Sequence, residues 1–174
     1  MNLGDISSFT TLASNLAVLV SLLFLGLQVR QGNRNQQSLM QQGRSARNVD
    51  LLARLSEPRL AKLMIRASQT DELADAEYLQ LYGYMASVFW SYEDCFFQFR
   101  AGMLDAKSWA SDVATLKRLF CNPVYRAVWK AARGALGEDY RDFLDGIASE
   151  SRSAAPANIA NVLKQYIAEE RRVR

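Results

Sequence analysis

The polar side chains that could do chemistry gather in one aromatic segment of the sequence, YEDCFFQFR, at residues 92–100. Two adjacent carboxylates, Glu93 and Asp94, could act as general acid and base or hold metal ions. Carboxylate metal sites in helical bundles use Glu-x-x-His motifs, however, and the sequence contains no histidine. Glu93 and Arg100 are seven residues apart and so share one helix face. We therefore expect a structural buried ion pair between Glu93 and Arg100, with Arg66 as the alternative partner of the carboxylate.

The rest of the sequence gives catalysis little support. Without histidine, the chain lacks the commonest catalytic base and zinc ligand. Cys95 and Cys121 show no CxxC spacing, and we expect two buried reduced thiols. Glycine-rich phosphate loops and a GxSxG nucleophile motif are missing, and a net charge of +3 is too small for a nucleic-acid footprint. We expect no enzyme activity, no catalytic residue, no metal, no cofactor and no nucleic-acid partner.

The composition favours an all-α fold. Half of the residues are hydrophobic, and the 174-residue chain contains only three prolines and nine glycines. Runs of β-branched residues with a period of two are missing, whereas stretches rich in Ala, Leu, Arg and Gln are long. The length suffices for one ordinary domain, or for a smaller domain with an appendage.

The first structural element expected from the sequence is a helix over residues 6–29, a segment that includes no charged side chain. As a helix these 24 residues would extend about 36 Å, enough to cross a hydrocarbon core of roughly 30 Å. A signal peptide fits poorly because no basic residue precedes the run and no small-x-small cleavage site follows it. A soluble core helix would present a charged face. We therefore expect a single transmembrane helix over residues 6–29.

The charges beside this segment predict its orientation. Arg30, Arg34, Arg44 and Arg47 follow the segment, whereas Asp5 precedes it. By the positive-inside rule, the N-terminus lies outside and the C-terminal domain is cytoplasmic. The cysteines agree with a reducing compartment. We expect the two nearest arginines, Arg30 and Arg34, to contact anionic lipid headgroups.

Small and polar residues recur on one face of the same helix, mostly at a spacing of seven. In lipid, helices associate through close approach of small residues and through interhelical hydrogen bonds. We therefore expect this face to pack against a transmembrane helix of another subunit or of a second copy. The alternative is that its hydroxyl groups bind their own backbone carbonyls. The residues of this partner-packing face are Ser7, Thr11, Ser14, Asn15, Ser21 and Gln28.

Prolines, glycines and capping residues divide the rest of the chain into short helices. Pro58 and Pro123 are expected to open helices, Asp105 to cap one, and Gly102 and Gly137 to separate others. A terminal helix is expected to begin at Pro156. The expected organisation is a short external N-terminus at 1–5, the transmembrane helix at 6–29, a juxtamembrane helical extension at 30–56, a cytoplasmic helical bundle at 57–150, and a linker with a C-terminal helix at 151–174.

Charge is segregated along the chain. Residues 30–66 include eight basic and two acidic side chains, whereas residues 71–112 include two basic and eight acidic ones. This asymmetry could draw the basic helix onto the acidic part of the bundle, or the arginines nearest the membrane could bind lipid headgroups.

Three segments carry a resemblance to known proteins: TLASNLAVLVSLLFLGLQVRQ, YEDCFFQFRAGMLDAKSW and NPVYRAVWKAARGALGEDYRDFLD. Over roughly residues 10–148 the chain resembles a widespread group of bacterial proteins that look like single-span anchors followed by a small helical domain. The resemblance implies a single-span anchor with a helical domain, located in the bacterial inner membrane. It implies no site residue, since no activity is established for the group.

Two functions are compatible with these features. The first is a non-enzymatic accessory or assembly subunit of a larger inner-membrane complex, which docks through its transmembrane helix and covers the cytoplasmic face of its partner. The alternative is a membrane-tethered sensor or regulator that binds a lipid or small hydrophobic ligand in its aromatic bundle. The aromatic residues of that bundle are Trp90, Tyr92, Phe96, Phe97 and Phe99.

Overall fold

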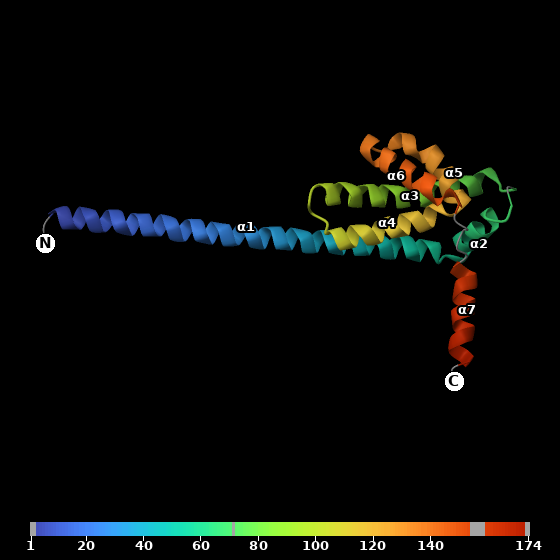
Figure 1. The fold of residues 1–174 in the computed structure, drawn as a ribbon, viewed down its shortest axis with the longest axis horizontal. Helices are drawn as coiled ribbons and strands as arrows, with labels where there is room; N and C mark the ends of the chain where they lie inside the picture. Colours follow the sequence, from blue (N-terminus) through green and yellow to red (C-terminus); the bar gives the residue numbers. More distant parts are fainter. Residues whose placement is uncertain (1–2, 71, 154–158, 173–174) are drawn as a thin grey trace. The chain divides into compact units, whose positions relative to one another are not determined.

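The computed structural model describes residues 3–70, 72–153 and 159–172, and within these ranges the fold is all-α, without a strand (Figure 1). The prediction of an all-α fold is therefore confirmed. Two short 3₁₀ turns, η1 (Arg133–Ala135) and η2 (Ser151–Ser153), accompany the α-helices. The α-helices are α1 (Leu3–Leu55), α2 (Pro58–Ala67), α3 (Asp75–Arg100), α4 (Ala106–Phe120), α5 (Pro123–Ala132), α6 (Glu138–Glu150) and α7 (Ile159–Arg172).

The first helix, α1, is continuous over 53 residues, so the expected span at 6–29 and the extension at 30–56 belong to one element. Gly26, Gly32 and Gly43 in the interior of α1 weaken its helix propensity by up to about 1 kcal/mol each, but they do not interrupt it. The chain divides into two structural units, residues 1–45 and residues 46–174. The second unit includes the helical bundle.

Most helix boundaries in the second unit follow from local capping. Asp105 caps α4, because its carboxylate accepts hydrogen bonds from the backbone N–H groups of Lys107 and Ser108, both at 3.0 Å. The Asn122 side chain caps α5 in the same way, and Pro58 and Pro123 occupy first positions of α2 and α5. These starts agree with the sequence prediction, whereas Pro156 lies outside the described residues.

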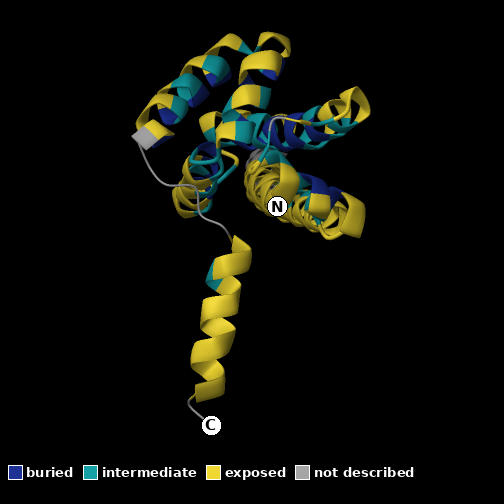
Figure 2. Cartoon of the chain, turned by 90° about the vertical axis from the view of Figure 1, so that its right-hand side faces the viewer, coloured by how far each residue is buried: buried dark blue, intermediate teal, exposed yellow. Residues whose placement is uncertain are grey.

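Helix α3 is the central element of the bundle. It contacts α2, α4 and α5, while α6 packs on α4. The inward faces of these helices are buried and their outer faces are exposed (Figure 2). Phe89 of α3 contacts the rings of Phe120, Tyr125 and Trp129 from α4 and α5. This aromatic cluster supplies much of the apolar area that stabilises the bundle.

A buried tyrosine joins α3 to α6. The Tyr140 hydroxyl donates a hydrogen bond of 3.0 Å to the backbone carbonyl of Phe89. Both side chains are fully buried. Burial, helped by the nearby Glu93 carboxylate, raises the pKa of Tyr140 above its usual range, so the phenol remains a hydrogen-bond donor.

Ion pairs connect the basic and acidic parts of the sequence. Arg47, near the end of α1, contacts Asp94 of α3 at 2.6 Å. Arg66 of α2 pairs with Glu77 of α3. The charge asymmetry thus draws basic helices onto the acidic helix α3 at these two positions. Because all four side chains are partly exposed, these pairs contribute little to the stability of the fold.

Candidate functional site

The apolar part of α1 is exposed on every side (Figure 2). Every large apolar side chain described between Leu12 and Val29 is at least 54% exposed. By length and composition, the helix over Ser14–Leu55 includes a segment able to cross a membrane, and none of that segment is buried within the protein. A water-soluble protein rarely exposes so large a continuous apolar surface.

The partner-packing face lies on this exposed helix. Ser14, Asn15, Ser21 and Gln28 are exposed. The Ser21 hydroxyl donates a hydrogen bond of 2.8 Å to the Ala17 carbonyl, which is the self-satisfied arrangement considered above. Its oxygen retains the capacity to accept a hydrogen bond from another helix.

Two further residues of that face, Ser7 and Thr11, belong to α1, but their side chains lie outside the described residues. Arg30 and Arg34 are exposed in the turns that follow the apolar segment. Packing of this face against a partner helix and lipid contact by these arginines remain predictions.

The expected buried ion pair between Glu93 and Arg100 is wrong. Glu93 instead accepts a hydrogen bond of 2.7 Å from the backbone N–H of Gly137, and Arg100 donates one of 2.5 Å to the Asp139 carboxylate. Arg100 is exposed and lies over the Phe96 ring. Seven helical residues rise about 10.5 Å, so Glu93 and Arg100 reach separate partners near the start of α6 instead of each other.

Glu93 acts as a helix cap supplied by another helix. Gly137 precedes the first turn of α6, where backbone N–H groups lack intrahelical acceptors. A carboxylate also interacts favourably with the positive end of the helix dipole. A Cβ atom at Gly137 would lie 3.2 Å from the Phe97 ring and 3.3 Å from the Glu93 carboxylate, so glycine permits this close approach. The arrangement stabilises the fold.

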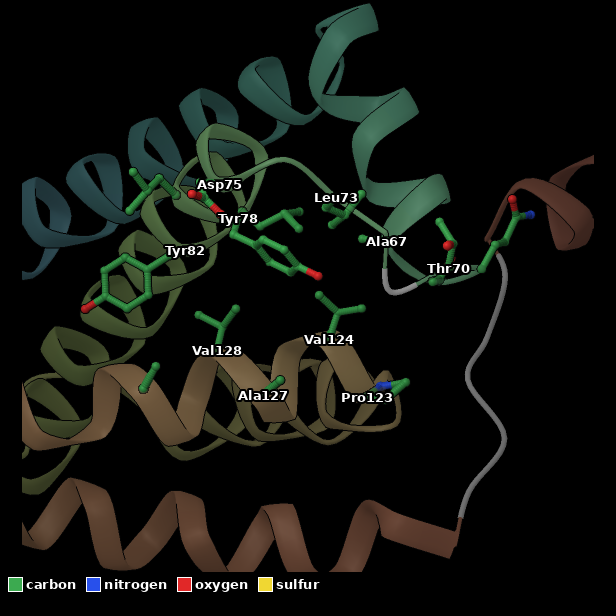
Figure 3. Close-up of a pocket in the computed structure, with 15 residues that line it drawn as sticks. Ala67, Thr70, Leu73, Asp75, Tyr78, Tyr82, Pro123, Val124, Ala127 and Val128 are labelled. Atoms are coloured by element: carbon green, nitrogen blue, oxygen red, sulfur yellow. The ribbon is translucent and has the colours of Figure 1, made fainter.

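An apolar groove of about 850 Å³ lies between α3 and α5, closed at one end by the C-terminal end of α2 and the connection to α3. The side chains of Tyr78 and Tyr82 face Val124 and Val128 across it (Figure 3). We call it the α3–α5 groove. Its main lining residues are Leu73, Tyr78 and Tyr82 on one side and Val124, Ala127 and Val128 on the other.

The chemistry of the groove suits an apolar ligand. Among its described lining residues, Asp75 is the one carboxylate, and the other polar side chains carry hydroxyl or amide groups. Within the ranges that the structure covers, no three histidine, cysteine, aspartate or glutamate side chains are placed to hold a metal. The groove therefore offers apolar surface with a single acidic edge.

Sequence reasoning missed the groove. The sequence feature that could have revealed the groove is the pattern of α5, which is apolar on two faces. Tyr125 and Trp129 turn into the core, whereas Val124 and Val128, one residue earlier in each case, line the groove. A ten-residue helix with two apolar faces needs two neighbours.

Two of the aromatic residues proposed as a ligand pocket, Phe96 and Phe99, pack against aromatic side chains of α4 and α6. Phe96 is buried against Trp109, Tyr140 and Phe143, and Phe99 stacks on Trp109. Trp90, Tyr92 and Phe97 also lie outside the groove lining. The groove is thus a different feature from the expected aromatic pocket.

The two cysteines differ in exposure. Cys95 is buried in the core, as expected. Cys121 is only half-buried, and its thiol donates a 3.3 Å hydrogen bond to the Lys117 carbonyl. Cys121 lies two residues before Pro123, which lines the groove, and offers a native labelling position on the bundle.

Comparisons with protein-family models, with curated proteins and with solved structures found no match.

Proposed function

We propose that this protein is a non-enzymatic, membrane-anchored accessory or assembly subunit of a larger bacterial inner-membrane complex. Residues 6–29 of α1 span the bilayer and dock on a transmembrane helix of the partner. The helical bundle covers the partner's cytoplasmic face. The exposed apolar surface of α1 is the observation that carries this proposal.

The large amount of apolar surface that α1 exposes supports membrane insertion on energetic grounds. Eleven large apolar side chains between Leu12 and Val29 are exposed on all sides of the helix. Moving one such side chain fully out of water stabilises a protein by about 1.5–3 kcal/mol. The uncharged segment is also long enough, at about 36 Å, for a hydrocarbon core of roughly 30 Å. A bilayer accommodates this surface on all sides at once.

Charge supports the orientation. Arg30 and Arg34 follow the apolar segment directly, and their side chains are exposed. Each arginine near an anionic cytoplasmic leaflet contributes about 1 kcal/mol. The proposed orientation therefore places the bundle in the cytoplasm.

The need for a partner rests on the polar side chains. Asn15 and Gln28 carry amide groups that α1 does not enclose, and isolated amides are unfavourable in hydrocarbon. Interhelical hydrogen bonds in membranes contribute about 0.6–2 kcal/mol each. With Ser14 and Ser21 on nearly the same face, a second helix can approach closely and satisfy these groups.

Topology can be tested with cysteine labelling. The variant Asn2→Cys places a thiol before the span, while the native Cys121 reports on the bundle. In intact cells, a membrane-impermeant maleimide should label position 2 and should label Cys121 only after permeabilisation. Labelling of Cys121 in intact cells would overturn the orientation.

Partner docking can be tested by comparing two double variants after extraction in mild detergent. Ser14→Leu/Ser21→Leu removes the small polar side chains from the partner-packing face. Leu16→Ile/Leu23→Ile is the matched control, with the same spacing on the leucine side. We expect one integral membrane protein to be recovered with the wild type and the control and to decrease at least tenfold with the serine variant. Equal recovery with all three proteins would contradict docking through this face.

A further inference from the structure

Helix α7 (Ile159–Arg172) presents an apolar stripe that its own residues cannot cover. Ile159, Leu163, Tyr166 and Ile167 follow one another at helical spacing and are between 43% and 73% exposed. None of the described residues of α7 is buried. A helix of 14 residues is marginally stable by itself in water. This stripe therefore requires an apolar surface to stabilise it.

We propose that α7 docks, through this stripe, in the α3–α5 groove of the same chain. The dimensions agree. The groove-lining residues of α5 run from Pro123 to Ala131, a rise of about 12 Å, and the stripe from Ile159 to Ile167 has the same rise. A volume of about 850 Å³ accommodates the apolar side chains of two helical turns.

The connection to α7 starts at the end of the bundle where the α3–α5 groove opens. Lys117, near the end of α4, contacts Glu150 at the end of α6 at 2.8 Å. From that end of α4 the chain passes through a two-residue connection to Pro123, which opens the groove. The end of α6 and the opening of the groove thus lie at the same end of α4. Six peptide units between Ser153 and Ile159 span up to about 20 Å. This length sets the distance that docking within one chain can bridge.

The charges of the groove and of α7 also favour docking of α7 in the α3–α5 groove. Asp75 lines the acidic edge of the groove, and Glu72 precedes it in the chain. Lys164 follows Leu163 and so lies at the edge of the apolar stripe. A docked α7 can place this ammonium group beside the acidic edge while its apolar side chains enter the groove. Docking makes α7 a built-in occupant, which any other apolar ligand of the groove must displace.

Photo-crosslinking of the full chain in phospholipid nanodiscs tests the contact. Benzoylphenylalanine replaces Tyr166 on the stripe, or Ala168 on the opposite face of α7 as the matched control. We expect irradiation to join position 166 to peptides 75–82 or 123–131 within one chain, with at least fivefold less of this product from position 168. Crosslinks to lipid alone, to other parts of the bundle, or to a second copy at twice the mass would each overturn the proposal.

Amide hydrogen exchange gives an independent readout. In the docked state, the amides of α7 should exchange at least tenfold more slowly than in the variant Leu163→Asp/Ile167→Asp. The control Gln165→Asp/Ala168→Asp alters the opposite face and should retain the protection. Because all four positions are exposed, the bundle remains folded in both variants. Unprotected α7 amides in the wild type would contradict docking, whether or not α1 spans a membrane.

Discussion

The indole N–H of Trp129 donates a hydrogen bond of 2.8 Å to the Asp145 carboxylate, which links α5 to α6. Trp129 is buried, and the same carboxylate pairs with Arg133. A half-exposed aspartate therefore satisfies a buried indole and orders the short η1 turn between the two helices.

Removing this acceptor should destabilise the bundle. Asp145→Ala leaves the indole N–H unsatisfied, and we expect the free energy of unfolding to decrease by about 2 kcal/mol. Asp145→Asn retains an oxygen acceptor, and its free energy of unfolding should decrease by about half as much. Urea unfolding followed by tryptophan fluorescence measures both changes. Equal losses for the two variants would indicate that charge, and not the indole hydrogen bond, determines the effect.

Glu93 and Arg100 should act independently. Glu93→Ala removes the cap of α6 and should cost about 1–2 kcal/mol. Arg100→Ala breaks an exposed ion pair and should cost less than about 1 kcal/mol. Because the two residues have different partners, their effects should add to within about 0.5 kcal/mol in the double variant. A coupling energy well above this value would indicate that Glu93 and Arg100 interact directly, as the sequence suggested.

The junction between α2 and α3 should lose stability in acid. The hydrogen bond from the Ala74 backbone N–H, together with Arg66, lowers the pKa of Glu77. A lowered pKa in the folded state stabilises the protein above the unfolded value of about 4.3, and this contribution disappears as the pH falls towards the folded value. Thermal unfolding midpoints measured from neutral pH to about pH 3 should therefore fall less steeply for Glu77→Gln than for the wild type. Identical slopes would count against this role.

The membrane anchor should be sensitive to charge in its centre. Each arginine at the middle of a transmembrane helix costs about 2.5–3.5 kcal/mol on insertion scales. Leu19→Arg/Leu23→Arg should therefore release the protein from membranes, whereas Gln37→Arg/Gln41→Arg, beyond the apolar segment of α1, should not. Sedimentation after an alkaline wash measures the retained fraction. Recovery of the wild type in the supernatant would refute the anchor.

Local signals made the helices predictable and left the contacts between them unresolved. Asp105, Asn122 and the prolines act on backbone groups within three residues, so their effects can be read from the sequence. Glu93 and Gly137 are 44 residues apart, and their contact depends on how α3 meets α6. The groove likewise depends on the crossing of α3 and α5. For these features the sequence specifies suitable residue types, while the packing selects the partner.

The hydrogen bond from Tyr140 to Phe89 has an acceptor that every amino acid provides. Because the oxygen belongs to the main chain, replacement of the Phe89 ring leaves the acceptor in place, while loss of the Tyr140 hydroxyl removes the bond. The alignment of α3 with α6 can therefore persist as the surrounding aromatic side chains diverge. In distant homologues, a retained tyrosine at this one position would mark the same helix pairing even where little other identity survives.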